Sequence, residues 1–270
     1  MTKAIAHIDA DIITYSVGFA AESDPVSFAL HSVKKMIESI VANTGADDYV
    51  IYLSGEGNFR DQAATTLPYK GNRKSNKPKH YSAIREYLID VHDAIVSFGC
   101  EADDLIGIAC TAEDGNVNVC CTIDKDLNMI PGFHYNWKHD TLWEITPEDA
   151  DAFFIEQMLT GDATDNIPGL YKFTGKKATK KVKERVKKDT FLDSWYELWD
   201  VYHEAFVEER ERNGLPPIPL SDIDFVVMST LFEIRDLLWI KRLQHDTAGD
   251  YLAECMELDV EIIAASSSNE

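Results

Sequence analysis

Long hydrophobic runs and paired cysteines are both missing from the sequence. No apolar run approaches the roughly 18 residues that a membrane-spanning helix needs, and the N-terminus has no basic region followed by an apolar stretch that would direct export. The five cysteines form no CxxC pair and are odd in number, so neither a disulfide framework nor a cysteine zinc site is indicated. We therefore expect a cytoplasmic protein with reduced cysteines in its core.

Several catalytic signatures are missing as well, and positive charge is scarce. The sequence has no GxSxG elbow, Walker A loop or GxGxxG fingerprint, which argues against acyl transfer, nucleotide triphosphatase activity and dinucleotide binding. Its eight histidines are scattered, which argues against a zinc cluster. Lys and Arg number 26 against 47 Asp and Glu, for a net charge of −21. Such a surface repels DNA except at a locally basic face.

The order of the predicted elements indicates the fold class. At 270 residues with 45% hydrophobic content, the chain can bury a substantial core. Short apolar runs rich in β-branched and aromatic residues predict strands at Ala4–Ile8, Tyr49–Leu53, Ala94–Phe98, Val117–Ile123 and, more weakly, His134–Trp137. Helical periodicity predicts helices at Val26–Ala42, Tyr81–Val91, Ala102–Ala112 and Pro147–Leu159. This alternation predicts an α/β fold with a mainly parallel central sheet flanked by helices.

The C-terminal part of the chain is predicted to be helical. No strand pattern follows residue 160, and the helices predicted there are Thr179–Lys188, Thr190–Arg212 and Ser221–Gln244. A proline-rich turn is expected at Leu215–Leu220 and a frayed tail at Ala264–Glu270. We therefore divide the chain into an α/β core, residues 1–160, and a helical region packed on it, residues 161–270.

One segment reverses the sign of the charge. Residues 172–188 contain nine basic residues and one acid, Glu184, so that their local charge is +8. The nine are Lys172, Lys176, Lys177, Lys180, Lys181, Lys183, Arg185, Lys187 and Lys188. Such a segment attracts phosphate groups through counterion release. The same composition is compatible with a solvated, lysine-rich helix face.

A second basic stretch lies between the second strand and the next helix. Residues 55–80 lack apolar periodicity and predict a long loop with Arg60, Lys70, Arg73, Lys74, Lys77 and Lys79. Phe59, Tyr69 and Tyr81 are interleaved with these cations, a pattern that suits single-stranded or splayed nucleic acid. A disordered surface loop is the alternative.

Acidic residues follow four of the predicted elements. They are Asp9 and Asp11; Glu101, Asp103 and Asp104; Asp124 and Asp126; and Asp162 and Asp165. One acid in such a place is commonly a helix cap, but the carboxyl ends of parallel strands face one crevice, where clustered carboxylates repel unless cations are present. Mg²⁺ suits oxygen ligands of this kind, with Mn²⁺ as a substitute. Two ions about 4 Å apart promote phosphodiester hydrolysis by water.

Residues 4–190 resemble the 5′ nucleases, a family of flap endonucleases, phage 5′–3′ exonucleases and the 5′ exonuclease domain of bacterial DNA polymerase I. The matching pieces are Ile8-Asp9-Ala10-Asp11, Tyr69-Lys70-Gly71-Asn72-Arg73, Cys100-Glu101-Ala102-Asp103-Asp104-Leu105, Thr122-Ile123-Asp124-Lys125-Asp126 and Gly161-Asp162-Ala163-Thr164-Asp165-Asn166-Ile167-Pro168-Gly169. Each motif alone is weak evidence for the family, but the five motifs in this order are specific to it. The compact arch segment, residues 59–91, is most similar to that of a phage-type enzyme.

The resemblance implies a DNA-cleaving enzyme with two metal ions. One ion is held or surrounded by Asp9, Glu101, Asp103, Asp124 and Asp126, and the other is served by Asp104, Asp162 and Asp165. Lys70 and Arg73 are then catalytic residues of the arch, which draw the scissile phosphate inward and stabilise developing charge. The expected activity is 5′–3′ exonuclease or flap endonuclease, as used in DNA replication.

The resemblance also implies how DNA is held. Residues 169–178 correspond to the family's helix-three-turn-helix motif, which grips the duplex backbone without reading bases and which in the family holds K⁺. The implied DNA contacts are Lys74, Gly169, Lys172, Gly175, Lys176, Lys177 and Lys180. Expected partners are DNA with 5′ ends, flaps or nicks, and RNA–DNA hybrids. We expect a monomer without membrane contact, in the host cytoplasm if a phage encodes it.

Two departures from the family pattern leave alternatives open. Ser54-Gly55-Glu56 stands where an acid usually follows the second strand, and the usual glycine-rich hairpin lacks its middle glycine between Gly169 and Gly175. Asp9-Ala10-Asp11 also has the DxD form of a haloacid-dehalogenase-like phosphatase, in which one aspartate is the nucleophile. A noncatalytic module that binds branched DNA is the third hypothesis.

Overall fold

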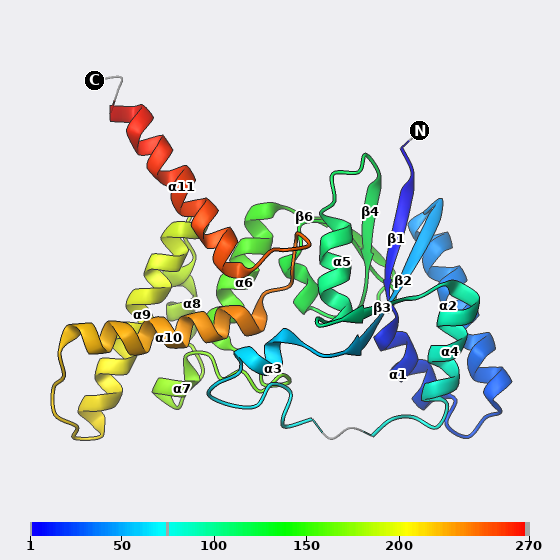
Figure 1. Cartoon of the computed structure of the whole chain (residues 1–270), viewed down its shortest axis with the longest axis horizontal. Coiled ribbons are helices and arrows are strands. Elements are labelled where there is room, and N and C mark those ends of the chain that lie inside the picture. The colour runs from blue at the N-terminus through cyan, green and yellow to red at the C-terminus, as the bar shows by residue number, and fades with distance from the viewer. Residues whose placement is uncertain (1, 74–75, 268–270) are drawn as a thin grey trace. The chain divides into compact units, whose positions relative to one another are not determined.

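The computed structural model describes residues 2–73 and 76–267, so that Lys74, a predicted DNA-binding residue, lies outside the described residues. The chain forms two compact units, each assembled from segments far apart in the sequence (Figure 1). Unit 1 comprises residues 1–59, 74–150 and 240–245. Unit 2 comprises residues 60–73, 151–239 and 246–270.

Unit 1 is built on a central sheet, which has six strands in the described residues, in the order β3-β2-β1-β4-β5-β6. The strands are β1 Ala4–Asp9, β2 Asp48–Glu56, β3 Ile95–Phe98, β4 Val117–Cys121, β5 Gly132–Asn136 and β6 Thr141–Ile145. All neighbouring pairs from β3 to β5 are parallel, and β6 is antiparallel to β5. The prediction of a mainly parallel α/β sheet is therefore confirmed.

Strand β6 is not among the five predicted strands, so the prediction missed one strand of the sheet. Three of its five residues are exposed, which removes the continuous apolar run that identifies the buried strands. A sequence signal does exist in the turn before it. The Asn136 side chain accepts hydrogen bonds from the backbone N–H groups of Lys138 (3.0 Å) and His139 (3.2 Å), and Asp140 has a φ of 49°. Both residue types favour such turns.

Helices α1 Ala10–Ala20, α2 Val26–Thr44, α4 Tyr81–His92 and α5 Ala102–Cys110 belong to unit 1, with the short 3₁₀ helix η1 Asp126–Met129. The three predicted helices α2, α4 and α5 are confirmed, with ends displaced by at most two residues. Helix α1 was not predicted. It begins directly after Asp9, which is the last residue of β1 and the N-cap of the helix.

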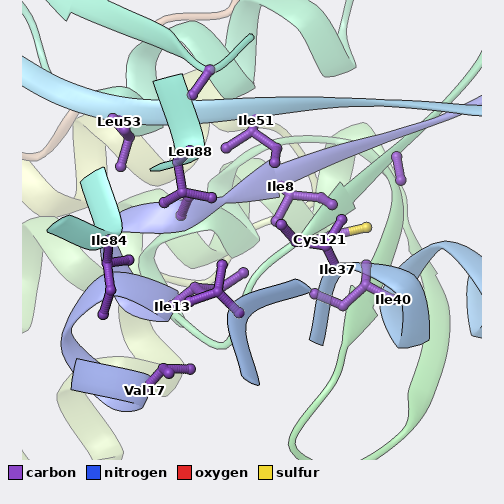
Figure 2. Close-up of a cluster of buried hydrophobic side chains, with 14 of the residues drawn as sticks. Ile8, Ile13, Val17, Ile37, Ile40, Ile51, Leu53, Ile84, Leu88 and Cys121 are labelled. Atoms are coloured by element: carbon purple, nitrogen blue, oxygen red, sulfur yellow. The ribbon is translucent and has the colours of Figure 1, made fainter. Parts of the chain in front are cut away.

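The main core of unit 1 lies between the sheet and helices α1, α2 and α4. Figure 2 shows Ile8 and Ile51 of neighbouring strands packed with Ile13 of α1, Ile37 of α2 and Leu88 of α4. All five side chains are at most 2% exposed. Successive strand residues point to opposite faces, so these apolar residues form one continuous face.

The other face of the sheet carries buried polar groups. His7 is 5% exposed, and its ring nitrogens form hydrogen bonds with the Tyr52 hydroxyl (2.9 Å) and the Asn118 side chain (3.0 Å). Burial lowers the pKa of His7, which favours its neutral form. Helix α5 covers this face, where its Cys110 lies beside Cys120 of β4. His7 is therefore a packed core residue.

The helices of unit 2 are mostly the predicted ones. Helices α3 Phe59–Ala63 and α6 Pro147–Thr160 each continue from unit 1, and α7 Tyr171–Thr174, α8 Lys180–Val186, α9 Phe191–Arg212, α10 Leu220–Leu238 and α11 Ala248–Ser267 follow. Helices α6, α8 and α9 confirm predictions. The predicted tail is wrong for residues 264–267, which are helical, while residues 268–270 lie outside the described residues.

Helix α10 ends at Leu238, six residues before the predicted end. The guanidinium of Arg60 explains the early end, because it donates hydrogen bonds to the carbonyl oxygens of Leu237 (3.0 Å) and Trp239. These are carbonyls that a helix terminus leaves without a helical partner. Arg60 is 2% exposed, so its assignment to the basic loop that meets nucleic acid is wrong.

Two further expectations concern membrane helices and cysteines. Within residues 2–73 and 76–267, no helix combines the length and the hydrophobicity needed to cross a bilayer. No disulfide joins the five cysteines, all of which lie in the described part of the chain. Cys120 and Cys121 are buried, whereas the other three are half-buried. The prediction of core cysteines is confirmed for that pair alone.

The packing of α4 predicts a sharp contrast between two neighbouring residues. Leu88 is fully buried, whereas Ile89 is 39% exposed. Leu88→Ala should destabilise the protein by about 2–5 kcal/mol, because it removes buried apolar surface and leaves a cavity. Ile89→Ala should cost less than about 1 kcal/mol. Urea unfolding followed by circular dichroism measures both values, and equal losses would contradict the packing described for α4.

Candidate active site

The carboxyl ends of β1 and β4 meet in unit 1, because these strands are parallel neighbours. Asp9 ends β1 and is 2% exposed. Thr122, which follows β4, donates a hydrogen bond from its hydroxyl to the Asp9 carboxylate (2.9 Å). The same hydroxyl oxygen accepts a hydrogen bond from the backbone N–H of Asp124 (3.0 Å). One side chain therefore joins two of the predicted acidic clusters.

The surroundings of Asp9 contain excess negative charge. Burial raises the pKa of the Asp9 carboxyl to about 7, with further contributions from the nearby charges of Asp11 and Asp124. The hydrogen bond from Thr122 opposes this rise, but it is the smaller effect. A buried carboxylate beside two others is stabilised in its charged form by a cation. This group of carboxylates therefore has the excess negative charge that is typical of a cation site.

Asp11 is neutralised by a neighbouring arginine. One carboxylate oxygen accepts a hydrogen bond from Arg85 of α4 (2.9 Å), and the other accepts one from the backbone N–H of Ser54 (2.8 Å). Arg85 also donates to the Ser54 carbonyl oxygen (2.7 Å), and the Ser54 hydroxyl accepts the N–H of Ala102 (3.0 Å). Ser54 therefore joins β2, α1, α4 and α5 where the resemblance expects an acid.

Glu101, Asp103 and Asp104 stand at the start of α5. Glu101 and Asp104 form a capping box, in which the Glu101 side chain accepts the Asp104 N–H and Asp104 accepts the Glu101 N–H (3.0 Å). Asp104 is fully buried, and its other carboxylate oxygen accepts the backbone N–H of Lys241 (3.2 Å). Asp103 lies in the first turn and is half-buried. Their metal-binding roles remain predictions.

Asp124 and Asp126 form a compact turn after β4. The Asp124 carboxylate accepts the backbone N–H of Asp126 (2.9 Å), and the Asp126 carboxylate forms an ion pair with Lys125 (3.0 Å). Both aspartates are half-buried. The Thr122 hydroxyl, which accepts the Asp124 N–H and donates to Asp9, connects this turn to the end of β1.

The carboxylates of unit 1 suit a divalent cation by their chemistry. Among the described residues, no group of three or more His, Cys, Asp or Glu side chains is arranged to hold a metal ion. The donor type nevertheless fits Mg²⁺ or Mn²⁺, because Asp9 and Asp124 offer carboxylate oxygens in a setting with excess negative charge. Asp11 is paired with Arg85, yet its charge still contributes to the raised pKa of Asp9.

Asp162 lies in a closed loop of unit 2, residues 161–169. Gly161 and Gly169, at the two ends, have φ values of 67° and 56° and approach so closely that a Cβ on Gly169 would lie 2.3 Å from the Gly161 nitrogen. Asp162 is 6% exposed, and its carboxylate accepts the backbone N–H groups of Thr164 (2.6 Å) and Asp165 (3.3 Å). The glycine pair and these hydrogen bonds fix the loop.

Asp165 gathers the two predicted catalytic cations of the arch. Its carboxylate forms ion pairs with Lys70 (3.7 Å) and Arg73, and it accepts a hydrogen bond from the Tyr69 hydroxyl (2.9 Å). The backbone N–H of Lys70 donates to the Asp165 carbonyl oxygen (3.0 Å). Lys70 and Arg73 are thus brought together, as their shared predicted role requires, and Asp165 is the residue that holds them.

Much of the charge of the basic segment is balanced within unit 2. The pairs are Lys183–Glu156 (2.6 Å), Arg185–Glu197 (2.5 Å), Arg185–Glu204 (2.5 Å), Lys188–Glu197 (2.9 Å) and Lys180–Glu184 (3.7 Å). Within the part of the chain that the structure describes, Lys176, Lys177, Lys181 and Lys187 form no ion pair within 4.0 Å. The local charge available to a phosphate backbone is therefore well below the +8 of the sequence count.

The predicted helix-three-turn-helix segment, residues 169–178, contains the short helix α7, and α8 begins just after it. A turn, residues 175–179, separates α7 from α8; Gly175 has a φ of 62°, and Thr179 caps α8 through the N–H of Val182 (3.3 Å). Lys172 donates to the hydroxyls of Thr66 (3.1 Å) and Thr230 (3.3 Å). Its ammonium group is thus engaged within the protein, whereas the DNA-binding role of this region remains a prediction.

Thr122 and Arg85 are the site residues that the sequence reasoning missed. Thr122 stands two residues before Asp124, so the Thr-x-Asp-x-Asp spacing could have indicated a hydroxyl beside the acids. Arg85 lies on the predicted helix Tyr81–Val91 with no neighbouring motif. Its contact with Asp11 joins residues 74 positions apart and has no local signal.

No family model matches the sequence, and a search of curated proteins finds no match. Among solved structures, the chain is similar to the bacteriophage T5 D15 flap endonuclease in a pseudo-enzyme-product complex with DNA and metal ions. The identity is 13%, the match covers 94% of this chain and 98% of the other, and the TM-score is 0.50. This chain shares the fold of that enzyme.

Two further T5 structures match with slightly lower scores. The T5 D15 protein crystallised with metal ions is 14% identical, with 86% and 100% of the two chains covered and a TM-score of 0.49. A variant of the T5 5′-exonuclease is 12% identical, with 85% and 99% covered and a TM-score of 0.47. At these identities the likeness concerns the fold.

The close approach of Gly161 and Gly169 in the loop of residues 161–169 leads to a prediction about stability. A Cβ at Gly161 would lie 2.2 Å from the Ile167 carbonyl oxygen, whereas nothing lies within 4 Å of one at Gly175. Both residues have positive φ, so alanine should cost about 1–2 kcal/mol at either position. Gly161→Ala should cost about 1–3 kcal/mol more, because the backbone must move. Denaturant unfolding measures the difference, and equal losses would contradict the close approach.

Proposed function

We propose that the protein is a metal-dependent 5′ nuclease, a 5′–3′ exonuclease or structure-specific flap endonuclease that hydrolyses DNA at 5′ ends, flaps or nicks. The observation that carries the proposal is the buried carboxylate of Asp9 beside Asp11 and Asp124, whose excess negative charge suits divalent cations. The fold shared with the T5 flap endonuclease supports the same conclusion.

The carboxylates at the ends of β1 and β4 would hold Mg²⁺, for which Mn²⁺ can substitute. Asp9 and Asp124 are the proposed ligands, with Glu101, Asp103 and Asp126 around them. When bound, two such ions lower the pKa of an attacking water and stabilise the leaving oxygen of a phosphodiester. Thr122 fixes the Asp9 carboxylate through its hydroxyl. The assignment of Asp104, Asp162 and Asp165 to a second ion stays a prediction.

Lys70 and Arg73 are the proposed phosphate-binding residues. Asp165 holds their ammonium and guanidinium groups at one place, and charge-assisted hydrogen bonds from such groups bind phosphate and stabilise its developing charge. Lys70 has a φ of 54°, an uncommon value for a residue with a side chain. The fixed turn at Lys70 is consistent with a functional constraint.

The region of α7 and α8 would hold the duplex by contacts to the phosphate backbone of the DNA. We assign this role to Lys176, Lys177 and Lys180, with Gly169 and Gly175 in the turns. A K⁺ site at this motif, cleavage of RNA–DNA hybrids and a monomeric state remain predictions from the resemblance.

The phosphatase alternative is not favoured by the surroundings of Asp11. In that reading Asp11 transfers a proton, but both of its oxygens accept hydrogen bonds, one from Arg85 and one from the Ser54 N–H. Both oxygens of Asp11 are therefore already engaged within the protein. A noncatalytic DNA-binding module is the remaining alternative, and an activity assay separates it from a nuclease.

The proposal is tested with 5′-labelled flap, blunt-duplex and RNA–DNA hybrid substrates in Mg²⁺, with p-nitrophenyl phosphate as a monoester. We expect the wild type to cleave the DNA flap and Asp124→Asn to cleave it at least about 100-fold more slowly, because a metal ligand supplies several kcal/mol of stabilisation. DNA binding measured in Ca²⁺ should change little. Asp90→Asn, an exposed position on α4, is the control and should behave as wild type.

Three results of this assay would contradict the proposal. Turnover of p-nitrophenyl phosphate without DNA cleavage favours the phosphatase. DNA binding without any cleavage favours the noncatalytic module. A wild-type rate for Asp124→Asn removes that residue from the site.

The basic region predicts a salt-dependent loss of binding. Replacing Lys176, Lys177 and Lys180 together by alanine should weaken duplex binding and lower the slope of log K against log salt concentration by up to about 3, since each phosphate contact contributes about 0.9. Replacing Lys34 and Lys35 on α2, which pair with Glu38, is the control. Fluorescence anisotropy at several salt concentrations measures both slopes. An unchanged slope in the triple variant would show that this region does not contact DNA.

A further inference from the structure

Segment 60–73 of unit 2 has little regular structure, although it carries the proposed phosphate-binding residues. Residues 60–63 belong to α3, and residues 64–73 lie outside helices and strands. Irregular backbone makes few internal hydrogen bonds, so other parts of the protein must hold it. Contacts from segment 60–73 to the rest of unit 2 therefore determine where Lys70 and Arg73 lie.

Contacts to the rest of unit 2 hold both ends of the segment. At the first end, the buried guanidinium of Arg60 donates hydrogen bonds to carbonyl oxygens at the end of α10. At the other end, Tyr69, Lys70 and Arg73 meet Asp165. Between Arg60 and Tyr69 the chain spans nine residues, which at about 3.3–3.6 Å per residue could follow many paths between two fixed ends.

Glu233 of α10 supplies the third contact point, in the middle of the segment. One of its carboxylate oxygens accepts the backbone N–H groups of Thr65 (2.8 Å) and Thr66 (2.5 Å). The other oxygen accepts the Thr66 hydroxyl (2.6 Å). The Thr66 hydroxyl oxygen in turn accepts a hydrogen bond from the ammonium of Lys172 (3.1 Å), which also donates to Thr230 on α10 (3.3 Å).

The charge of Glu233 strengthens these contacts. Partial burial raises the pKa of its carboxyl, but the hydrogen bonds from Thr66 and Thr65 outweigh this effect, and the pKa is lowered overall. Hydrogen bonds to an ionised acceptor are roughly twice as strong as those between neutral groups. Two consecutive backbone N–H groups on one oxygen also fix the chain direction at Thr65–Thr66, four residues before Lys70.

We infer that Glu233 is a positioning residue for the nuclease reaction, which fixes segment 60–73 so that Lys70 and Arg73 meet the scissile phosphate. Glu233 acts through the backbone of Thr65 and Thr66, without touching DNA. The inference rests on the proposed function, because it assigns the segment the role of phosphate binding. Helix α10 would then help to position the phosphate-binding residues, although it carries none of the acidic motifs.

The anchor itself is tested without any substrate. Hydrogen–deuterium exchange of the peptide that covers residues 64–73 should be at least about tenfold faster at the Thr65 and Thr66 amides in Glu233→Ala, since loss of the acceptor opens them to solvent. Glu233→Gln should restore most of the protection, because its amide oxygen still accepts both N–H groups and its amide nitrogen donates to the Thr66 hydroxyl. Asp224→Asn, a half-exposed acid on the same helix, is the control.

The effect on the reaction is tested by single-turnover cleavage of flap DNA. Glu233→Ala should lower the rate at saturating enzyme by about tenfold to a hundredfold, since a misplacement of about 1 Å can cost about 100-fold. The DNA dissociation constant in Ca²⁺ should stay within about threefold, and Glu233→Gln should recover most of the rate. Combining Glu233→Ala with Lys70→Ala should slow the reaction little beyond Lys70→Ala alone, because both changes remove the same contribution.

Separate outcomes distinguish this inference from the function on which it rests. Unchanged exchange at Thr65 and Thr66, a rate equal to that of Asp224→Asn, or fully multiplicative effects with Lys70→Ala would each overturn the positioning role alone. Equal cleavage rates for Glu233→Gln and Glu233→Ala would overturn it too. That result would mean that the negative charge of Glu233, and not its hydrogen bonds to Thr65 and Thr66, affects the rate. A wild-type protein that cleaves no DNA would overturn the proposed function and the positioning role together.

Discussion

The buried carboxylate of Asp9 is the constraint on which the arrangement of unit 1 depends. Parallel strands bring their carboxyl ends to one edge of the sheet, and Asp9 ends β1 there beside the segment after β4. Burial disfavours its charge, and Asp11 and Asp124 disfavour it further. The hydrogen bond from the Thr122 hydroxyl offsets only part of this. A stability cost of this kind is consistent with a site that binds cations.

Unit 2 meets a different requirement, which is to hold irregular backbone in one conformation. The acidic loop is closed by two glycines whose backbones nearly touch, so no side chain fits between them. Segment 60–73 is held instead by charged side chains, of which Arg60, Glu233 and Asp165 reach it at successive points. Hydrogen bonds to charged groups are stronger than neutral ones. Three such anchors explain how a segment with little secondary structure can present two cations together.

The sequence predicted the buried elements well and the contacts between distant residues poorly. Strands β1, β2 and β4 are apolar runs with buried residues, and β3 keeps an apolar sequence although three of its four residues are exposed. Strand β6 mixes apolar with polar residues and has no such run. Helix α1 was not predicted, although an acid after a strand was recognised as a common helix cap, the position that Asp9 takes. The acids that balance Lys183 and Arg185 lie up to 27 residues away. A local charge count therefore overstated the basic surface.

The two aspartates of the DxD motif show why a motif alone does not decide the chemistry. Asp9 is buried beside two other acids, whereas Asp11 is paired with Arg85. Ser54 of β2 supports this pairing through its backbone, because its N–H donates to Asp11 and its carbonyl oxygen accepts from Arg85. An acid at position 54 would add a further negative charge to the surroundings of Asp9. The two aspartates of one short motif thus differ in surroundings that residues far away in the sequence supply.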